Sequence, residues 1–339
     1  MHFLKTLTVA AIALATLVHG SPVPPELAVD HPEHASPLTK RSTAGFNDWK
    51  CKSSSAHPRA LVLVHGMSGN AIDNWLYMAP RFAAKGYCVF ALSYGQLNRV
   101  PIVYGLDKIE NSAQQLSDFI DKVLAATNTT QVDILGHSEG SFMPRYYLKR
   151  LGGASKVHKF AGIGAVNQGS TLRGLTMLLQ PLGLYDPVLK IIDPLCHACL
   201  QLLKDSAFLK ELNAGGDTVP GVEYLTLVTK YDEVVTPYTS GFLLDKNPKV
   251  QNHVLQDWCA LDLSEHLLIA FDPIVFNGLH AFFTPSSPLL QTSVSPVLTP
   301  SNDERQSGLS IVRWCSPSKK KQHDIHMDST PGTSKHSCE

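Results

Sequence analysis

Six apolar stretches with β-strand character alternate with helical patterns along the middle of the chain, and this alternation limits the possible folds. Alternating strands and helices build a parallel sheet, because each connection must cross from one end of the sheet to the other. Residues 61–64 read Leu-Val-Leu-Val, as expected for a strand covered on both faces. We therefore predict an α/β protein with a mostly parallel sheet of about six strands and helices on both faces. The stretches cover residues 60–65, 88–93, 132–135, 158–165, 222–229 and 250–256.

The connections between these stretches differ in character. Residues 109–124 carry apolar side chains at helical spacing, which predicts a long amphipathic crossover helix. Residues 171–212 form an insertion dense in Leu, Ile, Met and Pro, and we expect a helical cap there. Residues 284–339 are rich in Ser, Pro and Thr without an apolar period, which predicts a disordered C-terminal tail.

The N-terminus predicts export from the cell. An apolar run at residues 7–18 follows Lys5 and is too short to span a bilayer, so residues 1–20 are interpreted as a secretory signal peptide. Residues 21–41 are rich in Pro and His and end in a Lys-Arg pair, which indicates a propeptide and a mature protein that begins at Ser42. An N-terminal arm that is never trimmed is the alternative. The catalytic domain is then expected over residues 42–283, in a monomer.

The expected export predicts disulfides among the seven cysteines, because disulfides form in oxidising compartments. Cys51 precedes the first apolar stretch and Cys88 begins the second, so we predict a bridge between them that ties neighbouring strands together. Cys196 and Cys199 form a Cys-x-x-Cys pair, but no second pair accompanies them, which argues against a zinc or redox site. The pairing of the other cysteines stays open. Asn128 begins an Asn-Thr-Thr sequon in a polar turn and is the expected glycosylation site.

The composition excludes one class of partner. Of the 339 residues, 17% are charged and the formal net charge is zero, so the chain lacks the basic excess of a nucleic-acid-binding protein.

Residues 136–140 read Gly-His-Ser-Glu-Gly and follow directly on the third apolar stretch. A helical pattern follows, so strand, turn and helix occur in the order of a nucleophile elbow. Glycines on both sides allow a turn so tight that the hydroxyl of Ser138 projects from the backbone. Ser138 is therefore the predicted nucleophile, with an ordinary strand-to-helix turn as the alternative.

A serine nucleophile needs a base and an acid that orients the base. Position favours His266 as the base, since it lies in a loop after the last apolar stretch; His280 is the weaker candidate. The acid is expected after the fifth stretch, where Asp232 and Glu233 are adjacent. Asp232 is preferred because the shorter residue comes first out of the strand, and Glu233 stays the alternative.

Backbone N–H groups are expected to bind the oxyanion that forms on the attacked carbonyl. One donor should follow the nucleophile directly, at Glu139, where a helix begins. The other should come from the glycine-containing loop after the first stretch, and Met67 is the candidate.

Four separated segments together resemble the secreted class 2 triacylglycerol lipases of the α/β-hydrolase superfamily. They read Leu-Val-Leu-Val-His-Gly at 61–66, Gly-His-Ser-Glu-Gly at 136–140, Tyr-Asp-Glu-Val-Val-Thr-Pro-Tyr at 231–238 and Leu-Ser-Glu-His at 263–266. The resemblance covers residues 46–283. The long C-terminal tail and its two cysteines depart from the compact bacterial members, which puts the family's disulfide pattern and surface behaviour in doubt.

The resemblance implies an α/β-hydrolase fold, no metal or organic cofactor, and hydrolysis of carboxylic esters of lipids. It places Ser138, Asp232 and His266 at the triad positions, with Met67 and Glu139 at the oxyanion positions. The expected partner is a lipid or other ester, which an oil–water interface could present, with no transmembrane segment.

Apolar side chains of the insertion offer a surface for a fatty acyl chain, although ordinary helices that cap the sheet are the alternative. A short-chain or aryl carboxylesterase, an acyltransferase and a non-catalytic hydrolase-like binding protein are the other functions to be weighed. The acyl surface is expected at Leu175, Met177, Leu178, Leu179 and Leu182.

Overall fold

The structure is a computed structural model that describes residues 46–97, 102–172, 181 and 183–285. All of these residues belong to one compact unit, Gly45–Glu339. The predicted signal peptide, the propeptide and nearly all of the predicted tail lie outside the described residues. No helix within the described ranges is long and apolar enough to cross a membrane.

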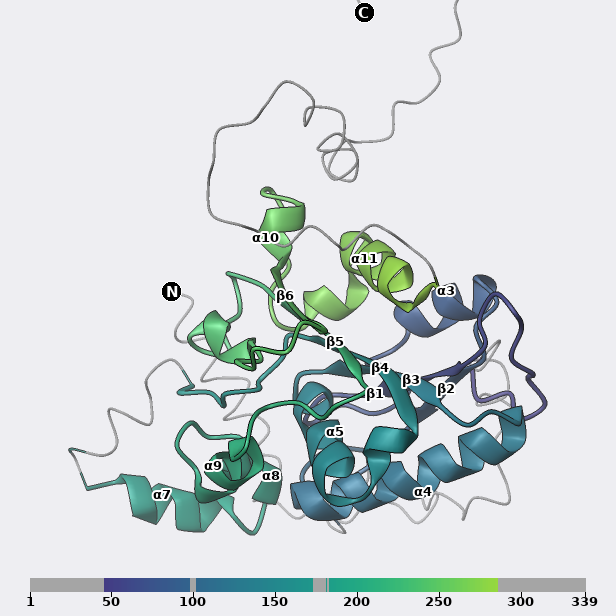
Figure 1. Cartoon of the computed structure of the whole chain (residues 1–339). Coiled ribbons are helices and arrows are strands. Elements are labelled where there is room, and N and C mark those ends of the chain that lie inside the picture. The colour runs from purple at the N-terminus through teal and green to yellow at the C-terminus, as the bar shows by residue number, and fades with distance from the viewer. Residues whose placement is uncertain (1–45, 98–101, 173–180, 182, 286–339) are drawn as a thin grey trace, which may run out of the picture. The chain divides into compact units, whose positions relative to one another are not determined.

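A six-stranded sheet forms the centre of this unit (Figure 1). Its strand order is β2-β1-β3-β4-β5-β6, and every neighbouring pair is parallel. The predicted parallel α/β sheet is therefore confirmed, and each strand falls on its predicted stretch. The strands are β1 (Ala60–Val64), β2 (Val89–Leu92), β3 (Val132–His137), β4 (Val157–Ile163), β5 (Glu223–Val228) and β6 (Val250–Val254).

Helices cover both faces of the sheet, as Figure 1 shows. Val62 and Val64 of β1 pack on one face with α4 (Ile109–Thr127) and α5 (Glu139–Arg150), while Leu61 and Leu63 pack on the other face with α3 (Met78–Ala84) and α11 (Pro273–Phe283). Successive side chains of a strand point to opposite faces, so a strand buried on both sides must be apolar throughout. Shorter helical segments are η2 (Gly153–Ser155), η3 (Tyr238–Gly241), α10 (Leu255–Trp258) and η4 (Leu268–Phe271).

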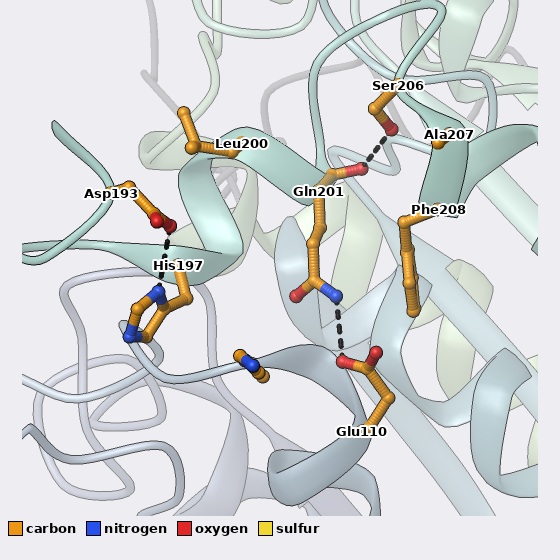
Figure 2. A pocket seen from close by; sticks show the side chains of 9 residues that line it. Glu110, Asp193, His197, Leu200, Gln201, Ser206, Ala207 and Phe208 are labelled. Carbon is orange, nitrogen blue, oxygen red and sulfur yellow. Dashed lines mark hydrogen bonds and ion pairs between the residues drawn. The ribbon is translucent and has the colours of Figure 1, made fainter. Parts of the chain in front are cut away.

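The insertion between β4 and β5 contains α7 (Tyr185–Ile192), α8 (His197–Gln201) and α9 (Ala207–Asn213). Gln201 of α8 donates to Glu110 of α4 at 2.7 Å, beside a cavity of about 310 Å³ (Figure 2). The five residues of the predicted acyl surface, from Leu175 to Leu182, lie outside the described residues.

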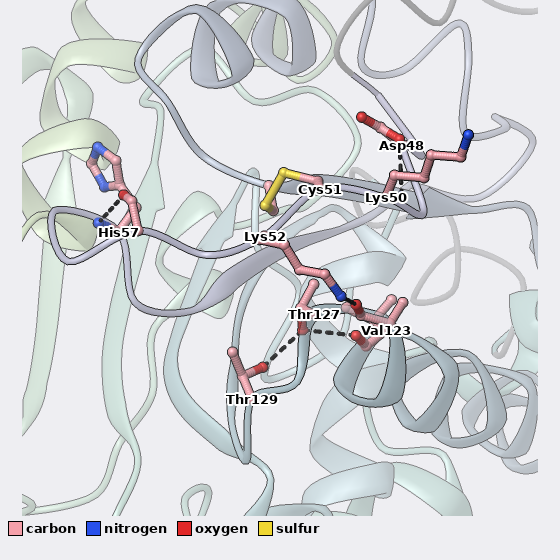
Figure 3. Close-up of a disulfide and its surroundings, with 11 residues drawn as sticks. Asp48, Lys50, Cys51, Lys52, His57, Val123, Thr127 and Thr129 are labelled. Carbon is pink, nitrogen blue, oxygen red and sulfur yellow. Dashed lines mark hydrogen bonds between the residues drawn. A yellow bond between two sulfur atoms is a disulfide. The ribbon is translucent and has the colours of Figure 1, made fainter.

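Two disulfides lie within the described part of the chain. Cys51 and Cys88 are joined, as the sequence predicts, with a Cα–Cα distance of 5.7 Å. The segment that follows Cys51 runs past the end of α4, where Lys52 donates to the carbonyl of Ala126 at 2.6 Å (Figure 3). Cys196 and Cys199 form the second disulfide, at the start of α8.

Candidate active site

The turn between β3 and α5 has the geometry of a nucleophile elbow. Strand β3 ends at His137 and α5 begins at Glu139, so Ser138 alone makes the turn. Its φ of 53° and ψ of −120° lie in a region that non-glycine residues rarely adopt. Such backbone strain is typical of functional sites, where the surrounding structure holds it in place.

Close backbone approach explains the two glycines of the elbow. A Cβ on Gly136 would overlap the carbonyl oxygen of Gly140, and a Cβ on Gly140 would overlap the carbonyl oxygen of Val64. The elbow therefore packs directly against the end of β1. A side chain at either position would push α5 away from the sheet.

Three side chains form a continuous hydrogen-bonded chain. His266 Nε2 lies 2.9 Å from the Ser138 hydroxyl oxygen, and His266 Nδ1 lies 2.8 Å from Asp232 Oδ2. The other oxygen of Asp232 accepts the N–H groups of Val234 and Val235 at 3.0 and 2.7 Å. When Nδ1 carries a hydrogen for the carboxylate, Nε2 is free to accept the hydrogen of the Ser138 hydroxyl.

The three hydrogen-bonded residues lie beyond the ends of three different strands. Ser138 follows β3, Asp232 follows β5, and His266 lies between α10 and η4, beyond β6. Parallel strands bring their carboxyl ends to one edge of the sheet, which is where ligands bind in open α/β folds. Asp232 and His266 are only 8% and 3% exposed, so both are shielded from water.

The alternative candidates lie elsewhere or have other contacts. His280 lies on α11, where its Nδ1 is 3.1 Å from the hydroxyl of Tyr87. Glu233 is half-buried, and burial together with the charge of Glu265 raises its pKa.

A second group of side chains braces the base. His137 Nε2 lies 2.9 Å from the carbonyl oxygen of His266, and its Nδ1 lies 3.0 Å from the side-chain oxygen of Asn74. The same oxygen of Asn74 accepts the N–H of Gly66 at 2.9 Å. Burial, aided by the charge of His266, lowers the pKa of His137 to about 3, so the neutral ring has a single N–H and donates to one of these two oxygens. Asn74 could not be predicted from the sequence, because an Asn in a polar loop carries no signal of its partner.

His65 holds the end of β1. Its Nδ1 lies 2.8 Å from the carbonyl oxygen of Gly66, and its Nε2 accepts the N–H of Tyr94 at 3.2 Å. These contacts require neutral imidazole, because Nε2 could not accept if it were protonated. Burial accordingly lowers the pKa of His65 to about 4.

The loop after β1 passes close to the nucleophile. A Cβ on Gly66 would lie 3.0 Å from the Cβ of Ser138, so the loop touches the elbow. The Ser68 N–H donates to the Tyr104 carbonyl at 2.9 Å, which ties this loop to the segment that leads into α4. Met67 lies between Gly66, which contacts the elbow, and Ser68, which is hydrogen-bonded to Tyr104.

The side chain of Glu139 is fully buried behind this loop. Desolvation raises the pKa of Glu139 well above its usual range. The neighbouring Tyr94 hydroxyl donates its hydrogen to the His65 carbonyl at 2.7 Å, so no donor among the described residues is directed at the Glu139 carboxyl. Burial therefore disfavours the charged form of this carboxyl.

A pocket of about 520 Å³ opens beside the nucleophile. Apolar side chains at its rim are partly exposed, with Leu267 at 61% and Val234 and Phe271 at 38% each. None of the described residues of the 171–212 insertion lines it. The lining residues are Gly66, Met67, Ser68, Gly69, Asp73, Asn74, His137, Ser138, Val234, His266, Leu267, Ala270 and Phe271.

Comparisons with known proteins identify the family of this chain. A family model described as Lipase (class 2) matches residues 58–273. Triacylglycerol lipases of Pseudarthrobacter phenanthrenivorans and Burkholderia plantarii are each 29% identical to this chain over 91 residues. These matches cover 25% of this chain and only 27% and 24% of the two relatives, so they span about a quarter of the relatives' length.

Solved structures share the fold. Aspergillus fumigatus lipase B superposes with a TM-score of 0.54 and 18% identity, over 76% of this chain and 61% of that protein. Bacillus licheniformis lipase BlEst2 in its mature form superposes with a TM-score of 0.50 and 16% identity, over 68% of this chain and 94% of that protein. At these identities the likeness shows the α/β-hydrolase fold alone.

Proposed function

This chain belongs to the class 2 lipase family, and we propose that it is a secreted serine hydrolase that cleaves carboxylic esters of lipids, as a triacylglycerol lipase does. The observation that carries the proposal is the unbroken series of hydrogen bonds from Ser138 through His266 to Asp232, with Ser138 and His266 lining an accessible pocket. An acid, a base and a hydroxyl in this order activate serine for acyl transfer.

The proposed reaction has two steps through one acyl-enzyme. His266 takes the proton of Ser138 as the hydroxyl attacks the ester carbonyl, and then gives this proton to the departing alcohol. Water then enters and attacks the acyl carbonyl as it loses a proton to His266. The bond between the acyl carbon and the Ser138 oxygen breaks, His266 returns the proton to that oxygen, and the fatty acid leaves. Asp232 holds the imidazole tautomer and stabilises its positive charge in both steps.

The negative oxygen formed in each step is proposed to lie between the backbone N–H groups of Met67 and Glu139. The contact of the Gly66 loop with the elbow supports this assignment, because it brings both residues beside Ser138. Donors fixed before the reaction stabilise developing charge without a reorganisation cost.

The surroundings of the pocket support a lipid substrate. Leu263 and Leu268, on either side of His266 in the sequence, are 69% and 55% exposed, and Leu268 directly follows Leu267 of the pocket lining. Exposed apolar residues gathered beside a polar catalytic group are typical of interaction sites. We propose that this rim meets the oil side of an oil–water interface, from which an acyl chain enters the pocket.

Export and glycosylation are part of the proposal. The two disulfides support an oxidising compartment. Asn128 is exposed at the C-terminal end of α4 in a left-handed conformation, where a glycan would have room. The proposed mature chain begins at Ser42.

The substrate class can be tested with p-nitrophenyl esters of increasing acyl length, measured below and above the concentration at which each ester forms an interface. Long-chain esters are expected to react faster than acetate or butyrate, with at least a several-fold rise when the interface appears. Leu263→Ser/Leu268→Ser is expected to remove that rise and to leave soluble short esters nearly unaffected, because it removes only exposed apolar surface.

Leu244→Ser is the matched control, since Leu244 is 68% exposed and lines a different cavity. It should leave the interfacial rise unchanged. Fastest hydrolysis of acetate or butyrate, with no response to the interface, would instead identify a carboxylesterase.

A further inference from the structure

The Cys196–Cys199 disulfide lies against the loop that carries Met67. Cys199 Sγ is 3.3 Å and Cys196 Sγ is 3.8 Å from the sulfur of Met67. The Met67 side chain therefore rests on the disulfide, while its backbone N–H belongs to the proposed oxyanion site. No pattern in the sequence connects these residues, which lie about 130 positions apart.

Helix α8 holds this disulfide in place from its other end. Gln201 accepts the N–H of Ile109 at 2.7 Å and donates to Glu110 at 2.7 Å, so α8 is attached to the first turn of α4 (Figure 2). The Ala198 N–H donates to the carbonyl of Leu106 at 3.3 Å. The Cys196–Cys199 disulfide is thus held by α8, which is hydrogen-bonded to α4 and to the segment that precedes α4.

The backbone of Met67 is confined on its opposite side. A Cβ on Gly105 would lie 3.1 Å from the Cα of Met67, and Ser68 is hydrogen-bonded to Tyr104. Met67 therefore has the 104–106 segment behind its backbone and the disulfide beneath its side chain. A change in either support would move its N–H relative to Ser138.

We propose that the Cys196–Cys199 disulfide positions Met67 for turnover, and that its two-electron reduction by a thiol lowers kcat. This inference rests on the proposed function, because it requires the Met67 N–H to face the oxyanion. In the reduction, a dithiol gives its two hydrogens and two electrons to the disulfide and closes to its own disulfide. The Sγ–Sγ bond breaks, and Cys196 and Cys199 each become a thiol.

The two sulfurs must then separate to van der Waals distance, roughly 3.5 to 4 Å, which reshapes the surface under Met67. Cys199 is partly exposed, so a thiol can reach this pair from solvent. Complete loss of one oxyanion donor lowers turnover by about 10² to 10³. Displacement of the Met67 N–H should lower turnover by a smaller factor than its complete loss would.

The test is the variant Cys196→Ser/Cys199→Ser in the full chain. Its kcat is expected to fall by about five- to fiftyfold, while KM stays within about twofold, since the oxyanion contact is made mainly in the transition state. Wild type treated with dithiothreitol should fall to the same kcat and recover on reoxidation. The variant should not respond to the reductant.

Cys51→Ala/Cys88→Ala is the matched control, because it removes a disulfide that packs against the end of α4 instead. It should lower the melting temperature and keep kcat within about twofold. If Cys196→Ser/Cys199→Ser fails to fold, reduction of wild type gives the same readout, with mass spectrometry showing which disulfide has opened.

An unchanged kcat after the Cys196–Cys199 bond is opened would overturn the inference. An equal loss of kcat in the control would also overturn it, because it would show a general effect of lost stability. Failure of the proposed function is distinguishable, since in that case Ser138→Ala would retain the activity whatever the state of the disulfide.

Discussion

Ser138→Ala is expected to lower kcat/KM for ester hydrolysis by a factor of roughly 10³ or more. The hydroxyl oxygen is the attacking atom, and no other nucleophile among the described residues occupies its place 2.9 Å from His266 Nε2. The rate on a soluble p-nitrophenyl ester measures the effect. Circular dichroism melting serves as the control, and the melting temperature should stay close to that of wild type, because the change removes one partly exposed oxygen. A loss of less than about a hundredfold would contradict the assignment.

Asp232→Asn is expected to lower turnover by about 10³ to 10⁴. The N–H groups of Val234 and Val235 will hold the amide oxygen where they now hold Oδ1, so the amide nitrogen must face His266. That nitrogen donates to Nδ1 and forces the hydrogen onto Nε2, which can then no longer accept the proton of Ser138. The measurement is kcat on the same soluble ester.

Glu233→Gln is the matched control for this substitution, because it makes the same carboxylate-to-amide change at the next residue. It should stay within a few-fold of wild type. If Glu233→Gln caused the larger loss, the acid would be Glu233 and the proposed role of Asp232 would be wrong.

The fold could be predicted because its signals are local. A strand buried on both faces must be apolar throughout, and each strand lies on a predicted stretch. Strand ends were less predictable. Strand β3 continues through Gly136 and His137, since both pair with β4, although neither residue type indicates a strand.

The elbow was visible in the sequence because its glycines are required by short-range contacts with the backbone. The bracing of His266 by His137 and Asn74 was not, since these residues meet only when the loop after β1, the end of β3 and the loop after α10 fold together. The same reason hides the contact between Met67 and the Cys196–Cys199 disulfide. Nor does the sequence show that burial raises the pKa of Glu139.

Covalent labelling tests the central claim, that Ser138 is the acylated nucleophile, most directly. The purified protein would be treated with a p-nitrophenyl alkylphosphonate, which phosphonylates an activated serine and releases p-nitrophenol. We expect a single adduct per molecule, located on Ser138 by peptide mass spectrometry and formed in step with the loss of activity. Ser138→Ala should form no adduct, and His266→Ala should react far more slowly. An adduct on another residue, or full activity in protein labelled at Ser138, would contradict the account.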